Sequence, residues 1–246
     1  MADQTYHWHI LDREVYLAIW IVCFALLGFY LLGKIRFKHD TPLEYISVGR
    51  LVLIIIDFAF VVYLIPGMWG APLKALSGYM PPMETQDFVL RPGAATPAPA
   101  TVDLTGTEVS LVHGLTGYSS LDAGIAAAAA TGKKVFVDIT GHGCVNCREM
   151  EARVWSDPQV LQKLREDFVI VALYTDDKVK LPESKWITTP EGKVLKDVGR
   201  VNSYIARTRF GVNAQPNYII LDANGNILAG PRGYDLSVQG FLEFLK

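Results

Sequence analysis

Residues 135–151 read Val135-Phe136-Val137-Asp138-Ile139-Thr140-Gly141-His142-Gly143-Cys144-Val145-Asn146-Cys147-Arg148-Glu149-Met150-Glu151. The stretch begins with apolar and β-branched residues, passes through a turn bracketed by two glycines, and continues with residues that favour a helix. This order predicts a strand, a turn and a helix. The pattern places a Cys-x-x-Cys pair at the start of that helix.

The positions of the two cysteines predict different roles for them. A helix N-terminus carries partial positive charge, which favours a thiolate over a thiol, so we expect Cys144 to be the nucleophile. Cys147 lies one turn deeper and is expected to be the resolving thiol. A Cys-x-x-Cys pair at a strand-to-helix junction indicates a thioredoxin-like redox motif. No cofactor is expected beyond the redox-active disulfide Cys144–Cys147.

Half of a zinc site is the main alternative interpretation of the pair, and zinc would need two further ligands. The only other cysteine, Cys23, lies in a hydrophobic segment. The histidines are His7, His9, His39, His113 and His142, and they form no spaced pair in the polar half of the chain. We therefore predict no metal at the cysteines. A buried, inert pair is disfavoured because Gly141 and Gly143 indicate an exposed turn.

Two acidic residues near the pair are candidates for proton transfer. Asp138 lies on a strand whose sequence suggests burial on both faces, where an unpaired carboxyl is costly. We expect a raised pKa for Asp138 and a role as acid and base for Cys147. Glu151 follows Cys147 by four residues on the same helix face, and it is either a second such group or an exposed carboxylate.

His142 is either a thiolate-stabilising cation or a solvated turn residue, and Arg148 is interpreted as a surface charge.

The cysteine stretch, with the Trp-Ser-Asp-Pro-Gln-Val segment at 155–160, resembles the C-terminal domain of the DsbD family of transmembrane thiol:disulfide interchange proteins. The segment Asn213-Ala214-Gln215-Pro216-Asn217-Tyr218 resembles the cis-proline loop of thioredoxins. The resemblance implies that Pro216 is cis and that the backbone of Gln215 pairs with an extended substrate. An ordinary loop proline is the alternative. One departure is Gly143, which occupies a position where thioredoxins usually carry tryptophan.

Two hydrophobic segments, about 15–33 and 51–69, are long enough to cross a membrane. A signal peptide is the alternative for the first, but no basic region precedes it. They resemble the last two helices of the DsbD membrane domain. The connecting loop carries Lys34, Arg36, Lys38 and Arg50, so the positive-inside rule predicts a cytoplasmic loop. We interpret Asp57, within the second segment, as a protonated or helix-paired structural carboxyl, and a polar contact or proton route within a larger bundle is the alternative. We interpret Cys23 as a small packing residue, with a redox centre as the alternative.

The predicted organisation is a membrane segment at 1–76, a flexible linker at 77–109 and a thioredoxin-like domain at 110–246. Pro81-Pro82, Pro92-Gly93 and the alternation of Ala and Pro at 94–100 indicate the linker. In the last part, helices are predicted at 121–131, 144–155, 158–164, 198–209 and 236–245. Strands are predicted at 134–139, 168–175, 218–222 and 226–229. Helices alternating with strands give an α/β fold.

These patterns, together with what the resemblance to the DsbD family implies, predict a membrane-anchored periplasmic thiol:disulfide reductase of a bacterial inner membrane. The expected partners are the lipid bilayer, periplasmic proteins with disulfides, and a membrane electron donor with an intramembrane cysteine pair. The formal charge of −2 gives no support to nucleic-acid binding. The alternatives are a tethered protein of cytochrome c maturation and a non-catalytic membrane-tethered adaptor.

Overall fold

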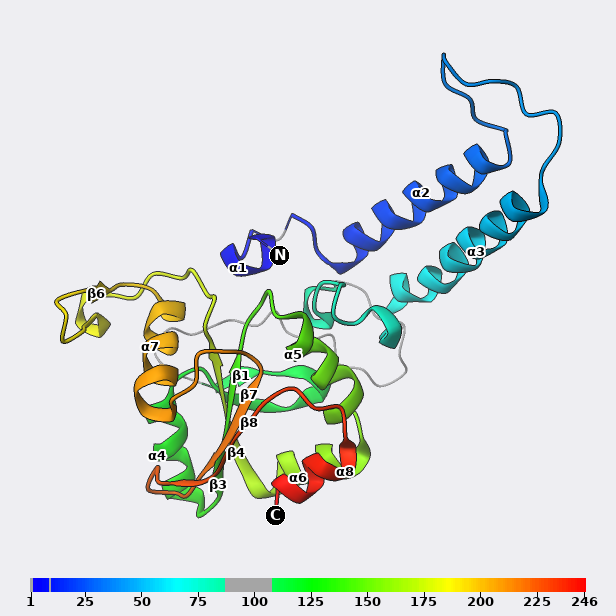
Figure 1. Ribbon diagram of the computed structural model, residues 1–246. Helices are drawn as coiled ribbons and strands as arrows, with labels where there is room; N and C mark the ends of the chain where they lie inside the picture. The colour runs from blue at the N-terminus through cyan, green and yellow to red at the C-terminus, as the bar shows by residue number, and fades with distance from the viewer. Residues whose placement is uncertain (1, 9, 87–107) are drawn as a thin grey trace.

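The computed structural model describes residues 2–8, 10–86 and 108–246, and its C-terminal half is built on a six-stranded sheet (Figure 1). The strand order is β1-β2-β4-β3-β7-β8. The strands are β1 Glu108–Ser110, β2 Thr116–Tyr118, β3 Lys134–Thr140, β4 Phe168–Tyr174, β7 Asn217–Leu221 and β8 Ile227–Arg232. Strand β3 is parallel to β4 and antiparallel to β7, so the sheet is mixed.

Strands β3 and β4 are buried along nearly their whole length because helices cover both faces of the sheet (Figure 1). The helices are α4 Leu121–Thr131, α5 Val145–Met150, α6 Pro158–Asp167, α7 Val198–Phe210 and α8 Val238–Phe244. Helices α5, α6 and α8 lie on one face, around a core that includes Phe136, Trp155 and Phe241. Helices α4 and α7 lie on the other, around Val137, Ala206 and Ile219.

The predicted helices and strands of this half are all present, with small shifts at their ends. The predicted helix over 144–155 changes at Glu151–Trp155 into a π-helical turn. Strands β1 and β2 were not predicted, because three residues are too few to show an alternation. The polar region at 177–197 contains a second, two-stranded sheet of β5 Ile187–Thr188 and β6 Val194–Leu195.

Two long apolar helices precede this domain, as the sequence predicts. They are α2 Arg13–Leu31 and α3 Val48–Leu64, the latter continued by a 3₁₀ turn at Ile65–Trp69. The helices run side by side (Figure 1), and Phe24 of α2 packs edge-on against Phe60 of α3, with ring centroids 4.8 Å apart. Many of their other apolar side chains point outward. By length and composition both helices could cross a membrane.

The two unusual residues of these helices lie in contrasting places. Asp57 is buried, and a Cβ on Gly28 of α2 would lie 2.6 Å from its Oδ2 atom, so the carboxyl faces the neighbouring helix. This fits the expectation of a carboxyl that faces protein. Cys23 is exposed, so the predicted packing role is wrong within this chain.

Residues 77–86, which the sequence assigns to the linker, are folded against the helices. The guanidinium of Arg13 donates a 2.7 Å hydrogen bond to the carbonyl of Pro81, and Met80 is fully buried. The side-chain amide of Gln86 donates to the carbonyls of Gly67 and Met68. Residues 77–86 therefore do not form the extended tether that the sequence predicts, because buried side chains and hydrogen bonds hold them against the helices. The remainder of the predicted linker, 87–107, lies outside the described residues.

Candidate redox site

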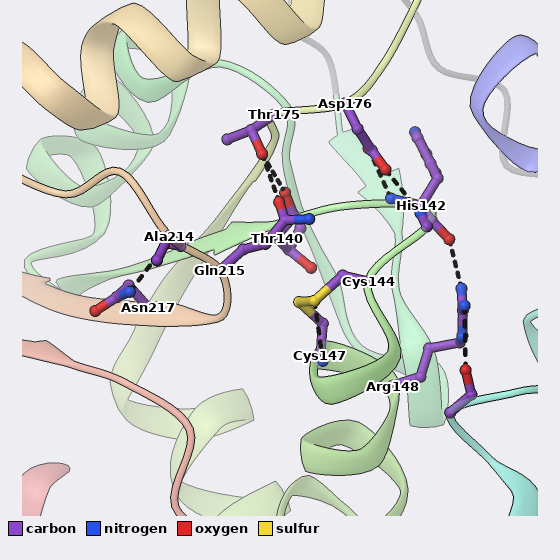
Figure 2. The surroundings of a disulfide bond; sticks show 12 residues. Thr140, His142, Cys144, Cys147, Arg148, Thr175, Asp176, Ala214, Gln215 and Asn217 are labelled. Atoms are coloured by element: carbon purple, nitrogen blue, oxygen red, sulfur yellow. Dashed lines mark hydrogen bonds between the residues drawn. A yellow bond between two sulfur atoms is a disulfide. The ribbon is translucent and has the colours of Figure 1, made fainter. Parts of the chain in front are cut away.

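The two cysteines lie at the start of helix α5, after the turn that connects it to strand β3. They form a disulfide with their Cα atoms 5.3 Å apart (Figure 2). Cys144 is the N-cap of α5, and its Sγ accepts a hydrogen bond from the backbone N–H of Cys147 at 3.1 Å. In the reduced state that N–H would stabilise a thiolate on Cys144, because hydrogen bonds to an ionised acceptor are the stronger ones.

The predicted exposure of the turn is wrong at Gly141, whereas His142 and Gly143 are partly exposed. Cys144 is only 6% exposed, Cys147 2%, and Gly141 is buried. The segment that follows α3 also reaches this site: Gly78 lies against Val145, the residue after the nucleophilic cysteine. The sequence does not suggest this contact, because 67 positions separate the two residues.

A pair of hydrogen bonds from the turn to Asp176 holds the backbone before Cys144 (Figure 2). The N–H groups of His142 and Gly143 donate to the two carboxylate oxygens of Asp176 at 2.8 and 2.7 Å. Asp176 follows β4, the parallel neighbour of β3. The carboxyl ends of neighbouring parallel strands lie at the same edge of a sheet. Sequence reasoning missed Asp176, although the pair Asp176-Asp177 directly after the predicted strand 168–175 was a signal that could have identified it.

The proline loop lies beside the same turn, and the Gln215–Pro216 peptide bond is cis, as the resemblance implies. The hydroxyl of Thr175 donates to the Gln215 side-chain carbonyl at 2.5 Å and to the carbonyl of Thr140 at 3.2 Å. A Cβ on Gly141 would lie 2.5 Å from the Gln215 side-chain nitrogen, so a larger residue there would displace the Gln215 amide. Among the described residues, no backbone hydrogen bond involves Gln215. The pairing of the Gln215 backbone with a substrate stays a prediction.

Asp138 is buried at the centre of the sheet, 4% exposed, and its Oδ1 has no hydrogen-bond partner among the described residues. Burial raises the pKa of Asp138 to about 8. Side chains alternate along a strand, so Asp138 faces the same side as Phe136, the side that α5 covers. The predicted raised pKa agrees with this environment, and the carboxyl faces the helix that carries Cys147.

Glu151 opens the π-helical turn after α5 and is half-buried. The ring of His113 forms a 2.7 Å hydrogen bond with its backbone carbonyl. The side chain stands close enough to Tyr218 for its charge, together with that of Asp138, to add to the effect of burial, which raises the tyrosine's pKa well above its ordinary value. Glu151 thus shares the environment of Asp138, and its role in proton transfer stays a prediction.

Two further residues differ from their predicted surroundings. Arg148 is buried, not a surface charge, and it donates hydrogen bonds to the carbonyls of His142 and Gly78. The ring of His142 is stacked on Tyr174 with centroids 4.1 Å apart, and it lies 3.2 Å from a carboxylate oxygen of Asp177. Neither is a solvated surface residue, because residues distant in sequence contact both. Gly78 contacts Arg148, and Tyr174 and Asp177 contact His142.

A capped Cys-x-x-Cys disulfide, a buried aspartate and a cis-proline loop at one edge of a mixed sheet define the class of thiol:disulfide oxidoreductases. Residues 121–246 match the thioredoxin-like domain family, and this match spans half of the chain. The chain belongs to that family. The mixed α/β fold predicted from the sequence is therefore confirmed as thioredoxin-like.

Among solved structures, DsbH oxidoreductase shares 16% identity, covering 50% of this chain and 77% of that chain, with a TM-score of 0.39. A thioredoxin from Thermus thermophilus shares 26% identity, with 51% and 80% covered and a TM-score of 0.34. A conserved protein of unknown function from Bacteroides fragilis shares 17% identity, with 61% and 100% covered and a TM-score of 0.31. No curated protein matches the chain. These similarities are not specific for DsbD.

Proposed function

We propose that the protein is a membrane-anchored thiol:disulfide reductase that acts on the periplasmic side of a bacterial inner membrane. The observation that carries the proposal is the Cys144–Cys147 disulfide at the start of α5, on the side of the sheet where Asp138 is buried. The anchoring part of the proposal is supported by the apolar helices α2 and α3. Its orientation rests on the basic residues of the loop between them.

The reaction proceeds in two exchange steps. The Cys144 thiolate attacks one sulfur of an acceptor disulfide, which forms a mixed disulfide and releases the other acceptor sulfur as a thiolate. The Cys147 thiolate then attacks the Cys144 sulfur, which closes the Cys144–Cys147 disulfide and releases the acceptor as a dithiol. Each turnover therefore oxidises the pair and reduces one acceptor disulfide by two electrons.

Asp138 has a role in the second step. Cys147 is almost fully buried, so its proton must leave through a neighbouring group before the thiol becomes a nucleophile. A carboxyl with a pKa of about 8 is shared between its acid and base forms near neutral pH, which suits it to accept that proton. Glu151, in the same environment, is proposed as a second group of this kind.

Gln215 and Pro216 are proposed to hold the acceptor chain. Their loop is tied to the ends of β3 and β4 through Thr175, and so its position is set relative to the cysteines. An extended acceptor segment would pair with the backbone of Gln215 as an added strand.

After each turnover the disulfide must be reduced again. We propose a dithiol in a separate membrane domain or subunit as the donor, since the spans of this chain contain a single cysteine, Cys23. The overall arrangement would match that of the C-terminal part of DsbD.

Insulin reduction by the purified full chain in detergent tests the enzymatic proposal, with the Cys144→Ser variant as the control. Turbidity from precipitating insulin chains is expected for the wild type only. A redox titration of the pair then separates a reductase, with a low potential, from an oxidase. Equal turbidity in the Cys144→Ser variant would contradict the proposal.

A further inference from the structure

Three potential metal ligands from distant parts of the chain meet beside the redox site. His7 follows the short helix α1 Ala2–Tyr6, His142 lies in the turn before the cysteines, and Asp177 follows strand β4. Their ligand atoms all lie within 4.8 Å of one another. The proposed redox reaction uses none of these three groups.

The distances between these atoms match those of a metal site. The Nε2 atom of His7 lies 3.5 Å from Oδ1 of Asp177, and Nε2 of His142 lies 3.2 Å from its Oδ2. Zinc bonds to imidazole and carboxylate of about 2.0–2.2 Å place neighbouring ligands of a tetrahedral ion about 3.3 Å apart. Both imidazole-to-carboxylate distances are close to this value, each to a different oxygen of Asp177, and one ligand atom from each of the three groups lies within 4.8 Å of the others.

The surroundings hold two of the ligands in place. The ring of His142 is stacked on Tyr174 at an interplanar angle of 9°, and its backbone is anchored on Asp176. The Asp177 side chain is 2% exposed, and its Oδ1 accepts a 2.8 Å hydrogen bond from the N–H of Val179. Partners of this kind around the ligands are usual at metal sites, where they set the orientation of each ligand.

The third ligand, His7, offers a ring nitrogen that makes only a long contact with Asp177. Nε2 of His7 is buried and has no hydrogen-bond partner among the described residues. Its 3.5 Å separation from Asp177 is too long for a well-formed hydrogen bond. The adjacent carboxylates of Asp176 and Asp177 also add negative charge that attracts a cation, and the nearby cation Arg148 bonds to the backbone carbonyl of His142.

We propose that His7, His142 and Asp177 bind one divalent transition-metal ion of the zinc type. Two imidazoles and one carboxylate are ligands that zinc accepts, and the ion would complete its tetrahedron with water or an added ligand. The histidine side chains are 29% and 15% exposed, so the site lies near the surface of the protein.

The site would connect the N-terminal segment to the redox domain. His7 precedes helix α2, and the carbonyl of the nearby Thr5 already accepts a 3.3 Å hydrogen bond from the N–H of Lys178. A bound ion would link His7 of this segment to His142 and Asp177 of the redox domain. It would hold the segment beside the turn that precedes Cys144.

The test is zinc titration of the full chain in detergent, without an affinity tag, against a chromophoric chelator. The disulfide is kept closed and all variants carry Cys23→Ser, so that no thiol competes for the metal. We expect one zinc ion per chain. Affinity should fall at least about tenfold in His7→Ala, His142→Ala and Asp177→Asn, and should not change in His113→Ala. Cobalt in place of zinc should give a four-coordinate visible spectrum without a sulfur charge-transfer band.

Absence of saturable zinc binding would overturn the proposal and leave the cluster as a hydrogen-bonded ion pair. Unchanged affinity in His7→Ala would also overturn it, since that residue lies outside residues 121–246 and its replacement leaves the redox domain intact. Thermal unfolding of each variant identifies any that fail to fold, and the comparison of His7→Ala with the wild type then decides. A sulfur-to-cobalt band would assign the metal elsewhere and likewise refute the site.

Discussion

Gly78, in the segment after α3, packs directly on Val145 of the active-site helix: a Cβ at Gly78 would lie 2.5 Å from Cγ1 and 3.0 Å from the carbonyl oxygen of Val145. The carbonyl of Gly78 also accepts a 3.4 Å hydrogen bond from the buried Arg148. The segment adjoining the apolar helices therefore covers one side of the redox site.

We predict that Gly78→Leu displaces this segment. Overpacking costs about 1–3 kcal/mol, which would open the contact and speed the reduction of Cys144–Cys147 by a phosphine at least about fivefold. Rates are measured on the full chain by quenching with an alkylating reagent. Gly49→Leu is the matched control, because nothing lies within 4 Å of a Cβ there. An equal rate in the two variants would show that the contact does not limit access.

Asp138→Asn should change the dependence of stability on pH. The folded pKa of about 8 lies above the ordinary value of 3.8, so between these values the folded state holds a proton that the unfolded state has lost. Stability due to this group therefore falls as pH rises through that window, by about 1.4 kcal/mol per unit. The asparagine variant lacks this loss. Unfolding midpoints of both oxidised proteins from pH 5 to about 9 should diverge, and parallel curves would refute the assignment.

The same substitution should alter the chemistry of Cys147. If Asp138 accepts its proton, the step that resolves a mixed disulfide slows in Asp138→Asn and loses its dependence on pH near 8. Stopped-flow release of a model thiol from a preformed mixed disulfide on Cys144 measures that step. The first attack by Cys144 serves as the internal control, and an unchanged resolving step would exclude the proton-transfer role.

The cysteines should differ in what they trap. Cys147→Ser leaves the nucleophile without a resolving thiol, so a mixed disulfide with an acceptor should accumulate. Cys144→Ser should trap none, since the remaining thiol is 2% exposed. Non-reducing gels with an acceptor carrying one disulfide distinguish the two. Stronger trapping by the Cys144→Ser variant would reverse the assigned roles.

Asp176→Ala should loosen the turn before the nucleophile. The substitution removes the acceptor of two backbone hydrogen bonds, from His142 and Gly143, at a cost of about 1–3 kcal/mol. Thermal unfolding is expected at a lower temperature than in the wild type. Asp122→Ala, at an exposed position in the first turn of α4, is the matched control and should unfold close to the wild type. Equal melting of both variants would show that Asp176 does not hold the turn.

We also predict that the chain alone does not carry reducing equivalents across a membrane. Thiol relay through a bilayer needs a dithiol there, and α2 and α3 contain only Cys23. The chain is reconstituted in liposomes with thioredoxin and its reducing system inside, and Cys144–Cys147 is monitored outside. No reduction is expected. Reduction that disappears in Cys23→Ser would instead establish that residue as a redox centre.

The sequence by itself determined the parts of this protein that depend on local pattern. Alternation of apolar residues, helix-forming runs and Gly or Pro at their ends located strand β3, the helix after it and the two long apolar helices. The spacing of Cys144 and Cys147 identified the redox pair. The cost of burying a carboxyl on a strand that is covered on both faces predicted the raised pKa of Asp138.

Only the tertiary structure decided which distant groups meet at the site. Asp176 and His7 contact the turn before Cys144, and Gly78 contacts helix α5, each from 33 or more positions away in the chain. A single side chain or carbonyl carries no periodic signal in the sequence. The burial of Cys144 and Arg148 was mispredicted for the same reason, because the segments that cover them are brought there by the fold. Local propensity acts over a few residues, whereas packing and hydrogen bonding depend on which surfaces the folded chain places together.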